Sequence, residues 1–92
     1  MAVTGKDKEF EKVLKALANR RRLAILRYIR EERDASVGQV AEHMCLSFKA
    51  TSKHLALLVA AGILDKEQRS VQMFFWIPRE IPELARRTLS IL

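Results

Sequence analysis

The side chains best suited to bind a polyanion lie between Ser47 and Gly62, in the stretch SFKATSKHLALLVAAG. Lys49 and Lys53 are four residues apart, so they project from one face of a helix, with Ser52 beside them. Lysine and serine side chains both bind DNA phosphates, and a small serine lets a helix approach the duplex. A helix with small, polar and basic leading residues is typical of one that enters the DNA major groove.

The other side of this helix is apolar. It shows helical spacing in Thr51, Leu55 and Leu58, which we expect to face inward. Ser47 is a suitable N-cap because its hydroxyl accepts a backbone N–H that no helical turn satisfies. Gly62 is a suitable terminator because glycine adopts the left-handed conformation without steric cost.

Other reactive side chains are few: one cysteine, Cys45, and two histidines, His43 and His54. A single cysteine cannot form an intramolecular disulfide, and the chain lacks the ligands of a thiolate metal cage. The sequence has no nucleophile–base pair, no carboxylate pair suited to acid–base catalysis and no phosphate-binding glycine loop. We therefore expect no enzyme, no metal and no cofactor.

The chain has 92 residues and a formal net charge of +6, from 17 Lys and Arg against 11 Asp and Glu. This length predicts a single small domain over residues 1–92, and the charge favours a nucleic-acid partner without proving one. No apolar run approaches the roughly 18 residues of a membrane span. The N-terminus lacks the apolar region of a secretory signal. We expect a cytoplasmic protein.

Residues 38–62 are interpreted as a helix-turn-helix. The spacing i, i+3, i+4 and i+7 is occupied by the apolar residues Val37, Val40, Ala41 and Met44. This spacing predicts a short first helix that begins near Ser36 or Gly38. Residues 45–47 form the turn, and the polar residues 31–36 predict a loop before the first helix. A second helix with basic leading residues completes the arrangement.

After residue 62 the pattern changes to alternation. Val71, Met73 and Phe75 alternate with polar and aromatic residues, which predicts a strand. Residues 63–67 are its expected partner, and residues 68–70 the loop, with Arg69 at the tip. A basic-tipped hairpin after a recognition helix is a wing, here residues 63–77, and Pro78 ends it because proline lacks the ladder donor.

Two amphipathic helices, residues 7–17 and 82–92, bracket this unit, after a flexible tail over residues 1–6. Their apolar faces consist of Phe10, Val13, Leu14 and Leu17 in the first helix and Leu84, Ala85, Thr88, Leu89 and Leu92 in the last. A domain of this size seldom needs two extra amphipathic helices for its own core. We therefore expect these faces to join two subunits, whose two-fold symmetry suits palindromic DNA.

Three stretches together resemble the ArsR-type winged-helix repressors: LKALANRRRLAIL (residues 14–26), VGQVAEHMCLSFKATSKHLALLVAAGIL (residues 37–64) and the hairpin up to Phe75. The family pattern has an alanine–leucine run, a cap and an arginine–leucine pair that opens the second helix. Its helix-turn-helix ends in a serine, a basic residue, a histidine and a leucine, here residues 52–55. The resemblance covers most of the chain, from Phe10 onward.

This resemblance implies a mainly helical fold with a small β-hairpin: four helices, two strands and a last helix, dimerising through the first and last helices. It implies a homodimeric repressor that binds a palindromic operator in double-stranded DNA. The recognition helix would contact DNA through Phe48, Lys49, Ala50, Ser52, Lys53 and His54. The wing would add Arg69, with Lys66 and Ser70.

Two departures from the family pattern concern metals. Many members sense metals through cysteines that open the helix before the turn, where this chain has Ser36 and Gly38. Others use histidines and carboxylates on the last helix, which has no histidine here. We expect no metal sensing at either family site, and the effector stays unidentified.

Several alternatives stay open at this stage. The domain could bind another protein rather than DNA, and His54 could support its helix rather than contact a phosphate. Asn19 is a good cap for the second helix, but the next three arginines oppose the helix dipole. They could form a solvated cluster with one acidic partner, or bind a phosphate. For Cys45 we expect a small buried thiol.

Overall fold

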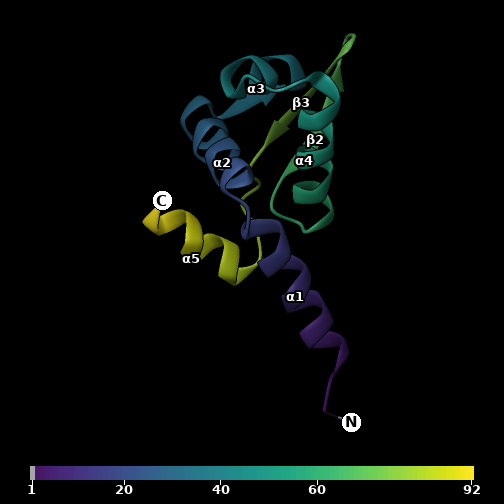
Figure 1. Ribbon diagram of the computed structural model, residues 1–92, viewed down its shortest axis with the longest axis vertical. Coiled ribbons are helices and arrows are strands. Elements are labelled where there is room, and N and C mark those ends of the chain that lie inside the picture. The colour runs from purple at the N-terminus through teal and green to yellow at the C-terminus, as the bar shows by residue number, and fades with distance from the viewer. Residues whose placement is uncertain (1) are drawn as a thin grey trace.

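A computed structural model describes residues 2–92 of the chain (Figure 1). The observed elements are α1 (Gly5–Leu17), α2 (Arg20–Glu32), β1 (Asp34–Ser36), α3 (Val37–Met44), α4 (Phe48–Ala60), β2 (Asp65–Arg69), β3 (Gln72–Trp76) and α5 (Glu83–Ile91). The expected order of helices and wing strands is confirmed, and one further strand, β1, joins them.

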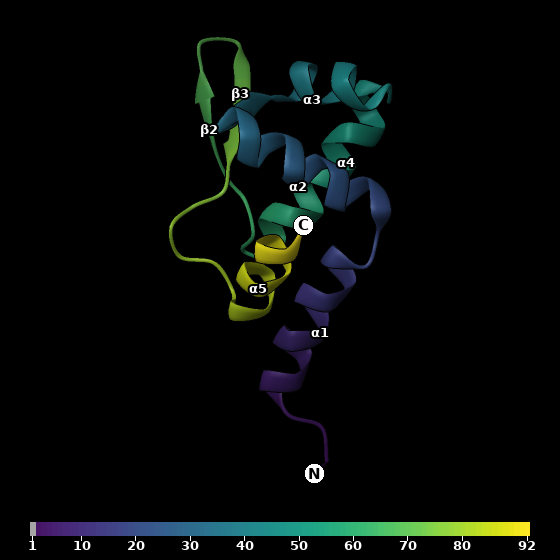
Figure 2. The same ribbon diagram turned by 90° about the vertical axis from the view of Figure 1, so that its left-hand side faces the viewer.

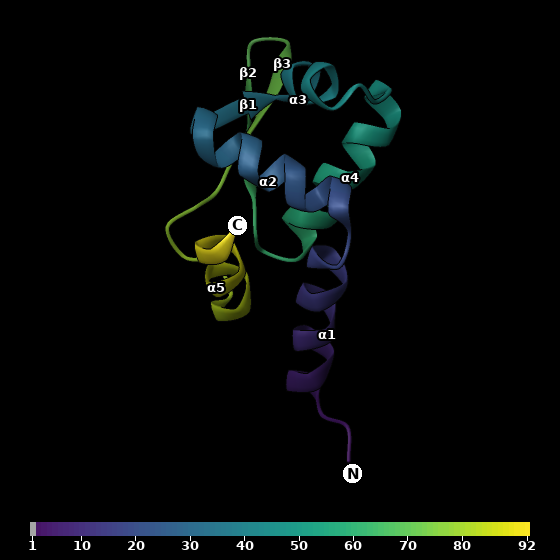
Figure 3. The same ribbon diagram turned by 60° about the vertical axis from the view of Figure 1, so that its left-hand side comes forward.

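The molecule is elongated, with principal extents of 46 × 24 × 23 Å. Helices α1 and α5 lie together at one end, whereas α3, the beginning of α4 and the tip of the β2–β3 hairpin lie at the other (Figures 1 and 2). Helix α2 crosses the middle between these ends (Figure 3). The chain therefore separates the surface expected to dimerise from the surface expected to bind DNA.

The core is built on α2. Ile25, Leu26 and Ile29 on this helix are completely buried, and so are Leu55 and Leu58 on α4. Cutting one such side chain to alanine typically costs about 2–5 kcal/mol. The expected inward face of α4 is confirmed, so the opposite face of α4 is held toward solvent.

Side-chain caps begin four of the helices. Asn19 accepts from the backbone N–H groups of Arg21 and Arg22, and Ser47 accepts from that of Ala50, as expected. Ser36 forms a capping box with Gln39 at the start of α3. Helix α1 begins at Gly5 rather than Asp7 because Thr4 and Asp7 form a second capping box, so the expected tail over residues 1–6 was too long; Met1 lies outside the described residues.

The polar segment before α3 was expected to be a loop, and this was wrong. Helix α2 continues to Glu32, Arg33 turns the chain at φ 73°, and residues 34–36 pair antiparallel with Trp76, Phe75 and Phe74. The sheet is therefore three-stranded, in the order β1-β3-β2. Three residues are too few to show an alternating pattern, although Ala35 is completely buried.

The hairpin also differs from expectation. Its first strand is Asp65–Arg69 instead of residues 63–67, and the turn is made by Ser70, at φ 58°, and Val71. Ile63 and Leu64 are buried core residues. Their N–H groups bond back to the carbonyl of Leu58 in the last turn of α4, so these two residues close the helix instead of pairing in the sheet. Arg69 is therefore on a strand and not in the loop.

The apolar faces of the end helices are used partly within one chain. Val13, Leu17, Ala85 and Leu89 are buried in the core of the single chain, so they leave little surface for a second subunit. Their assignment to a subunit interface stays a prediction. The other side chains of this set remain accessible to different degrees. Phe10 and Leu14 are 55% and 45% exposed, and Leu84, Thr88 and Leu92 are half-buried.

Two glycines give a matched stability test. Gly62 has φ +76°, and an alanine Cβ there would meet only Pro82 at 3.9 Å, so the cost of Gly62→Ala is backbone strain of about 1 kcal/mol. Gly38 is helical, and its new Cβ would meet only the Ser36 hydroxyl at 3.9 Å. Gly38→Ala should therefore stabilise by about 0.5–1 kcal/mol. Urea unfolding of both variants measures the difference, and shifts of the same sign would contradict this account.

Candidate nucleic-acid interface

The leading end of α4 projects at the end of the molecule opposite α1 and α5. The Ser47 carbonyl accepts from the Thr51 hydroxyl at 2.9 Å, which anchors the first turn, and Thr51 itself is completely buried. On the outer side, Lys49 and Lys53 are exposed, and Ala50 and Ser52 are half-buried. This turn therefore presents two ammonium groups around small side chains, as a helix that enters a groove requires.

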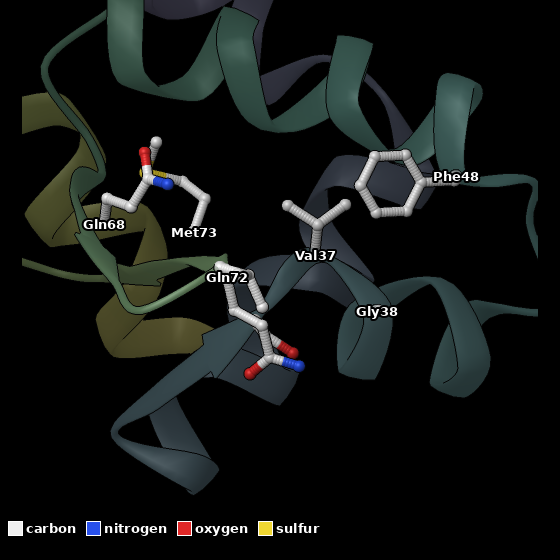
Figure 4. Close-up of a pocket in the computed structure, with 8 residues that line it drawn as sticks. Val37, Gly38, Phe48, Gln68, Gln72 and Met73 are labelled. Carbon is white, nitrogen blue, oxygen red and sulfur yellow. The ribbon is translucent and has the colours of Figure 1, made fainter.

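Phe48, the first residue of α4, is 64% exposed and lies at the mouth of a hollow of about 250 Å³ between α4, the start of α3 and the wing (Figure 4). Gln68 and Gln72 reach this hollow from the wing, and the exposed Val71 lies at the hairpin turn. Glutamine amides can donate to and accept from base edges. Sequence reasoning missed these glutamines, because only the folded wing brings them beside α4.

In the wing, the guanidinium of Arg69 is held by the protein. Its Nη1 donates to Asp34 of β1 at 2.7 Å, its Nε donates to Glu67 at 2.7 Å, and it stacks 4.7 Å from the ring centre of Phe74. These hydrogen bonds to the two carboxylates raise the pKa of Arg69. Lys66 and Ser70 are exposed, so these two carry the unpaired polar groups among the three wing residues proposed from sequence.

The thiol of Cys45 is exposed, so the expectation of a buried cysteine is wrong. Cys45 is the C-cap of α3 in the left-handed conformation, with φ 55°, and its N–H bonds to carbonyls of the last turn. This conformation turns the side chain outward, where its Sγ lies 3.9 Å from the Glu42 carbonyl.

His54 lies on the side of α4 that faces α2, and its Nδ1 lies 3.3 Å from Nη1 of Arg22. Burial lowers the pKa of His54, and the nearby Arg22 and Arg21 charges lower it further. A neutral ring that accepts at Nδ1 carries its proton on Nε2, as the hydrogen-bond network assigns it. This contact favours a supporting role for the half-buried His54 over a phosphate contact.

Within residues 2–92, no acidic side chain pairs with Arg22, which belongs to the cluster expected to have one acidic partner. Its Nε donates to the Ala16 carbonyl at 2.7 Å, and its Nη2 donates to the Lys15 carbonyl at 2.9 Å. These are carbonyls at the end of α1, where the helix dipole is negative. The arginine is therefore stabilised by a neighbouring helix end rather than by a carboxylate.

The family of the chain follows from its likeness to known proteins. The sequence profile described as "Bacterial regulatory protein, arsR family" matches residues 19–66, more than half of the chain. The chain belongs to the arsR family. The matched family is one of bacterial regulatory proteins, which agrees with the expectation of a regulator rather than an enzyme.

Individual relatives agree with this assignment. The chain is 36% identical over 63 residues to the transcriptional activator HlyU of Vibrio cholerae, a match that covers 68% of this chain and 57% of that protein's length. The structure of reduced HlyU from Vibrio cholerae superposes with a TM-score of 0.77 at 28% identity, covering 95% of this chain and 87% of the other.

A further structure is similar in fold. It is the homodimeric winged helix-turn-helix DNA-binding domain Mb0332 of Mycobacterium bovis, described as a possible ArsR-family regulator, with a TM-score of 0.76 and 24% identity. This likeness covers 99% of this chain and 85% of that one. The mainly helical winged fold with a three-stranded antiparallel wing is thereby confirmed.

The rest of the described chain bears on the expectations for metal ligands, for His43 and for membrane spans. Within residues 2–92, no three side chains of His, Cys, Asp or Glu are grouped so that they could hold a metal ion. His43 stacks on Tyr28, with ring centres 4.1 Å apart. None of the helices in the same residues is long and apolar enough to cross a membrane.

The position of His54 predicts a pH dependence of stability. Because its pKa is lower in the folded protein than the unfolded value of about 6.5, the unfolded state takes up the proton first as the pH falls. The free energy of unfolding should therefore be highest above that unfolded value and decrease as the pH falls through the folded pKa. Urea unfolding from pH 8 to pH 5 should show a smaller decrease in His54→Asn, and equal pH profiles would contradict the assignment.

Proposed function

We propose that this arsR-family protein is a homodimer that binds a palindromic operator in double-stranded DNA and represses transcription. The observation that carries this proposal is the exposed basic end of α4, with Lys49 and Lys53, at the pole opposite α1 and α5. A dimer joined at α1 and α5 would present two such ends on one side.

In the proposed complex, the first turns of the two α4 helices enter successive major grooves about 34–36 Å apart. Ala50 and Ser52 are small and allow close approach, and Lys49 and Lys53 bind phosphates and base edges. Phe48 either contacts a thymine methyl or supports the turn. Lys66 and Ser70 of the wing contact the neighbouring backbone. Arg69 contributes by holding β1 to β2, because its guanidinium is already bound by Asp34 and Glu67.

The dimer is supported by apolar surface left at the other pole. Phe10 and Leu14 on α1 are exposed although Val13 between them is buried, and Ile91 on α5 is 85% exposed. Phe10 also borders a hollow of about 250 Å³ between α1 and α5, lined by Val13, Pro82 and Leu84. A second copy of the same faces would cover these side chains, and the similar Mycobacterium bovis domain is described as homodimeric.

The proposal includes no metal sensing at the two family sites. At the first, the residues are Ser36, whose hydroxyl is used to cap Gln39, and Gly38, which has no side chain. At the second, α5 has no histidine, and Glu83 is engaged by Arg86 and Arg87. A DNA partner also implies a cytoplasmic location.

Repression requires only that the bound dimer occupy a promoter. The relative HlyU is named an activator, and activation would need an additional contact with the transcription machinery. Transcription in vitro from a promoter that overlaps the bound site distinguishes the two, because repression lowers transcript yield as protein is added and activation raises it.

The electrostatic part of the proposal is tested by Lys49→Gln/Lys53→Gln. The slope of log affinity against log salt should become shallower by about 0.9 for each DNA phosphate that the variant no longer neutralises. Fluorescence anisotropy with duplex DNA selected by the wild-type protein measures this slope. The matched control, Lys8→Gln/Lys12→Gln, removes the same charge from exposed positions on α1 and should retain most of the slope.

Equal slopes in the two double variants would indicate that the basic end of α4 does not bind DNA. Absence of DNA binding by the wild type would favour the alternative, a winged-helix module that binds another protein.

The dimer surface is tested by Leu14→Glu. This side chain is 45% exposed in the single chain, so the variant should fold, yet it should sediment as a monomer because a charge would be buried between subunits. Val71→Glu, at a side chain 89% exposed on the opposite pole, is the control and should remain dimeric. A dimeric Leu14→Glu protein would exclude α1 from the interface.

The absence of metal sensing is tested by titration. Adding zinc or arsenite to the complex with selected DNA should leave the affinity within about twofold of its metal-free value, because each tenfold change would need about 1.4 kcal/mol of coupling. A large change that saturates at one metal per subunit would refute this part of the proposal.

A further inference from the structure

Helix α2 holds both end helices by their C-terminal carbonyls. Arg22, in its first turn, donates to the Lys15 and Ala16 carbonyls of α1. Arg30, in its last turn, donates to the carbonyls of Leu89 and Leu92 at the end of α5. Both guanidinium groups lie where the dipoles of the bound helices are negative, so both attachments are charge-assisted.

Arg22 differs from Arg30 in one respect. Its third nitrogen, Nη1, lies 3.3 Å from Nδ1 of His54 on α4, so a single planar guanidinium contacts both α1 and the recognition helix. The geometry of the fork leaves little freedom, because Nε, Nη1 and Nη2 are each directed at a different acceptor. No part of the proposed DNA complex explains this contact, since Arg22 is half-buried behind α4.

We propose that Arg22 is a positioning residue that fixes α4 relative to α1 and thereby sets the distance between half-sites that the dimer accepts. This inference rests on the proposed function, in which α1 belongs to the dimer interface. One base pair of added spacing moves a half-site by about 3.4 Å and rotates it by about 34°. A rigid link between α1 and α4 makes such a displacement costly, whereas a loose link tolerates it.

The test uses duplexes that carry two copies of a half-site selected by the wild type, with their separation changed one base pair at a time. The wild type should prefer one separation by at least about tenfold, equivalent to about 1.4 kcal/mol. Arg22→Met keeps an unbranched apolar stem that ends about where Nε lies, and it removes all three donor nitrogens. It should lower this preference by about tenfold while leaving the affinity for a single half-site less affected.

Two matched variants separate positioning from charge and from general stability. Arg21→Met removes an equal charge from an exposed neighbour whose side chain makes no hydrogen bond or ion pair with the described residues, and it should keep the preferred separation. Arg30→Met removes the corresponding attachment of α5 without a contact to α4, and it should also keep it. A preference that is retained in Arg22→Met, or abolished equally in Arg30→Met, would overturn the inference.

A second variant serves if Arg22→Met does not fold, as judged by circular dichroism. His54→Phe breaks only the link to α4 and leaves both bonds from Arg22 to α1, so it should also relax the separation. If it changes only the bases preferred within each half-site, His54 acts on DNA directly and the inference fails. In the wild type, ¹⁵N NMR should show Nδ1 of His54 unprotonated, with a resonance that shifts more in Arg22→Met than in Arg21→Met.

These outcomes are distinct from failure of the proposed function. A wild-type protein that selects no two-fold symmetric DNA would refute the homodimeric operator-binding proposal itself. A wild type that selects such DNA, with the preferred separation unchanged in a folded Arg22→Met protein, would refute only the role of Arg22.

Discussion

The structure depends on the packing of one side of α4 against α2. Leu55 and Leu58 are completely buried against a core that contains Ile25 and Leu26, so α4 cannot rotate without exposing apolar surface. The lysines on its outer side are consequently held toward solvent. The orientation of the proposed DNA-binding surface thus follows from the hydrophobic effect, because the buried side of α4 determines the direction in which its lysines point.

Around this packing, polar contacts establish where each helix begins and how the poles are connected. Asn19, Ser36 and Ser47 cap α2, α3 and α4, and Arg22 and Arg30 attach the end helices to α2. Each contact is modest in energy, yet together they relate the end proposed to dimerise to the end proposed to bind DNA. In this winged fold, polar contacts therefore control how α4 is placed relative to α1 and α5, which is the geometry that binding to two-fold symmetric DNA would require.

Much of this could be predicted from the sequence, because helical periodicity and caps are local signals. The inward face of α4, its cap Ser47 and its terminator Gly62 were all recognisable in this way. Contacts between distant segments could not be recognised from the sequence. Strand β1 has only three residues, which are small or polar, and Arg69 binds Asp34 across the sheet. The partition of the α1 and α5 faces between core and surface likewise depends on tertiary packing, as Val13 and Phe10 show.

The most direct test of the central claim is an NMR titration of the ¹⁵N-labelled chain with its selected duplex. The account predicts that the largest amide shifts occur in the first two turns of α4, near Lys49 and Lys53, and at the Ser70–Val71 turn of the wing. Amides at the beginning of α1 and throughout α5 should change little. Shifts concentrated on α1 and α5, with α4 unaffected, would contradict the account.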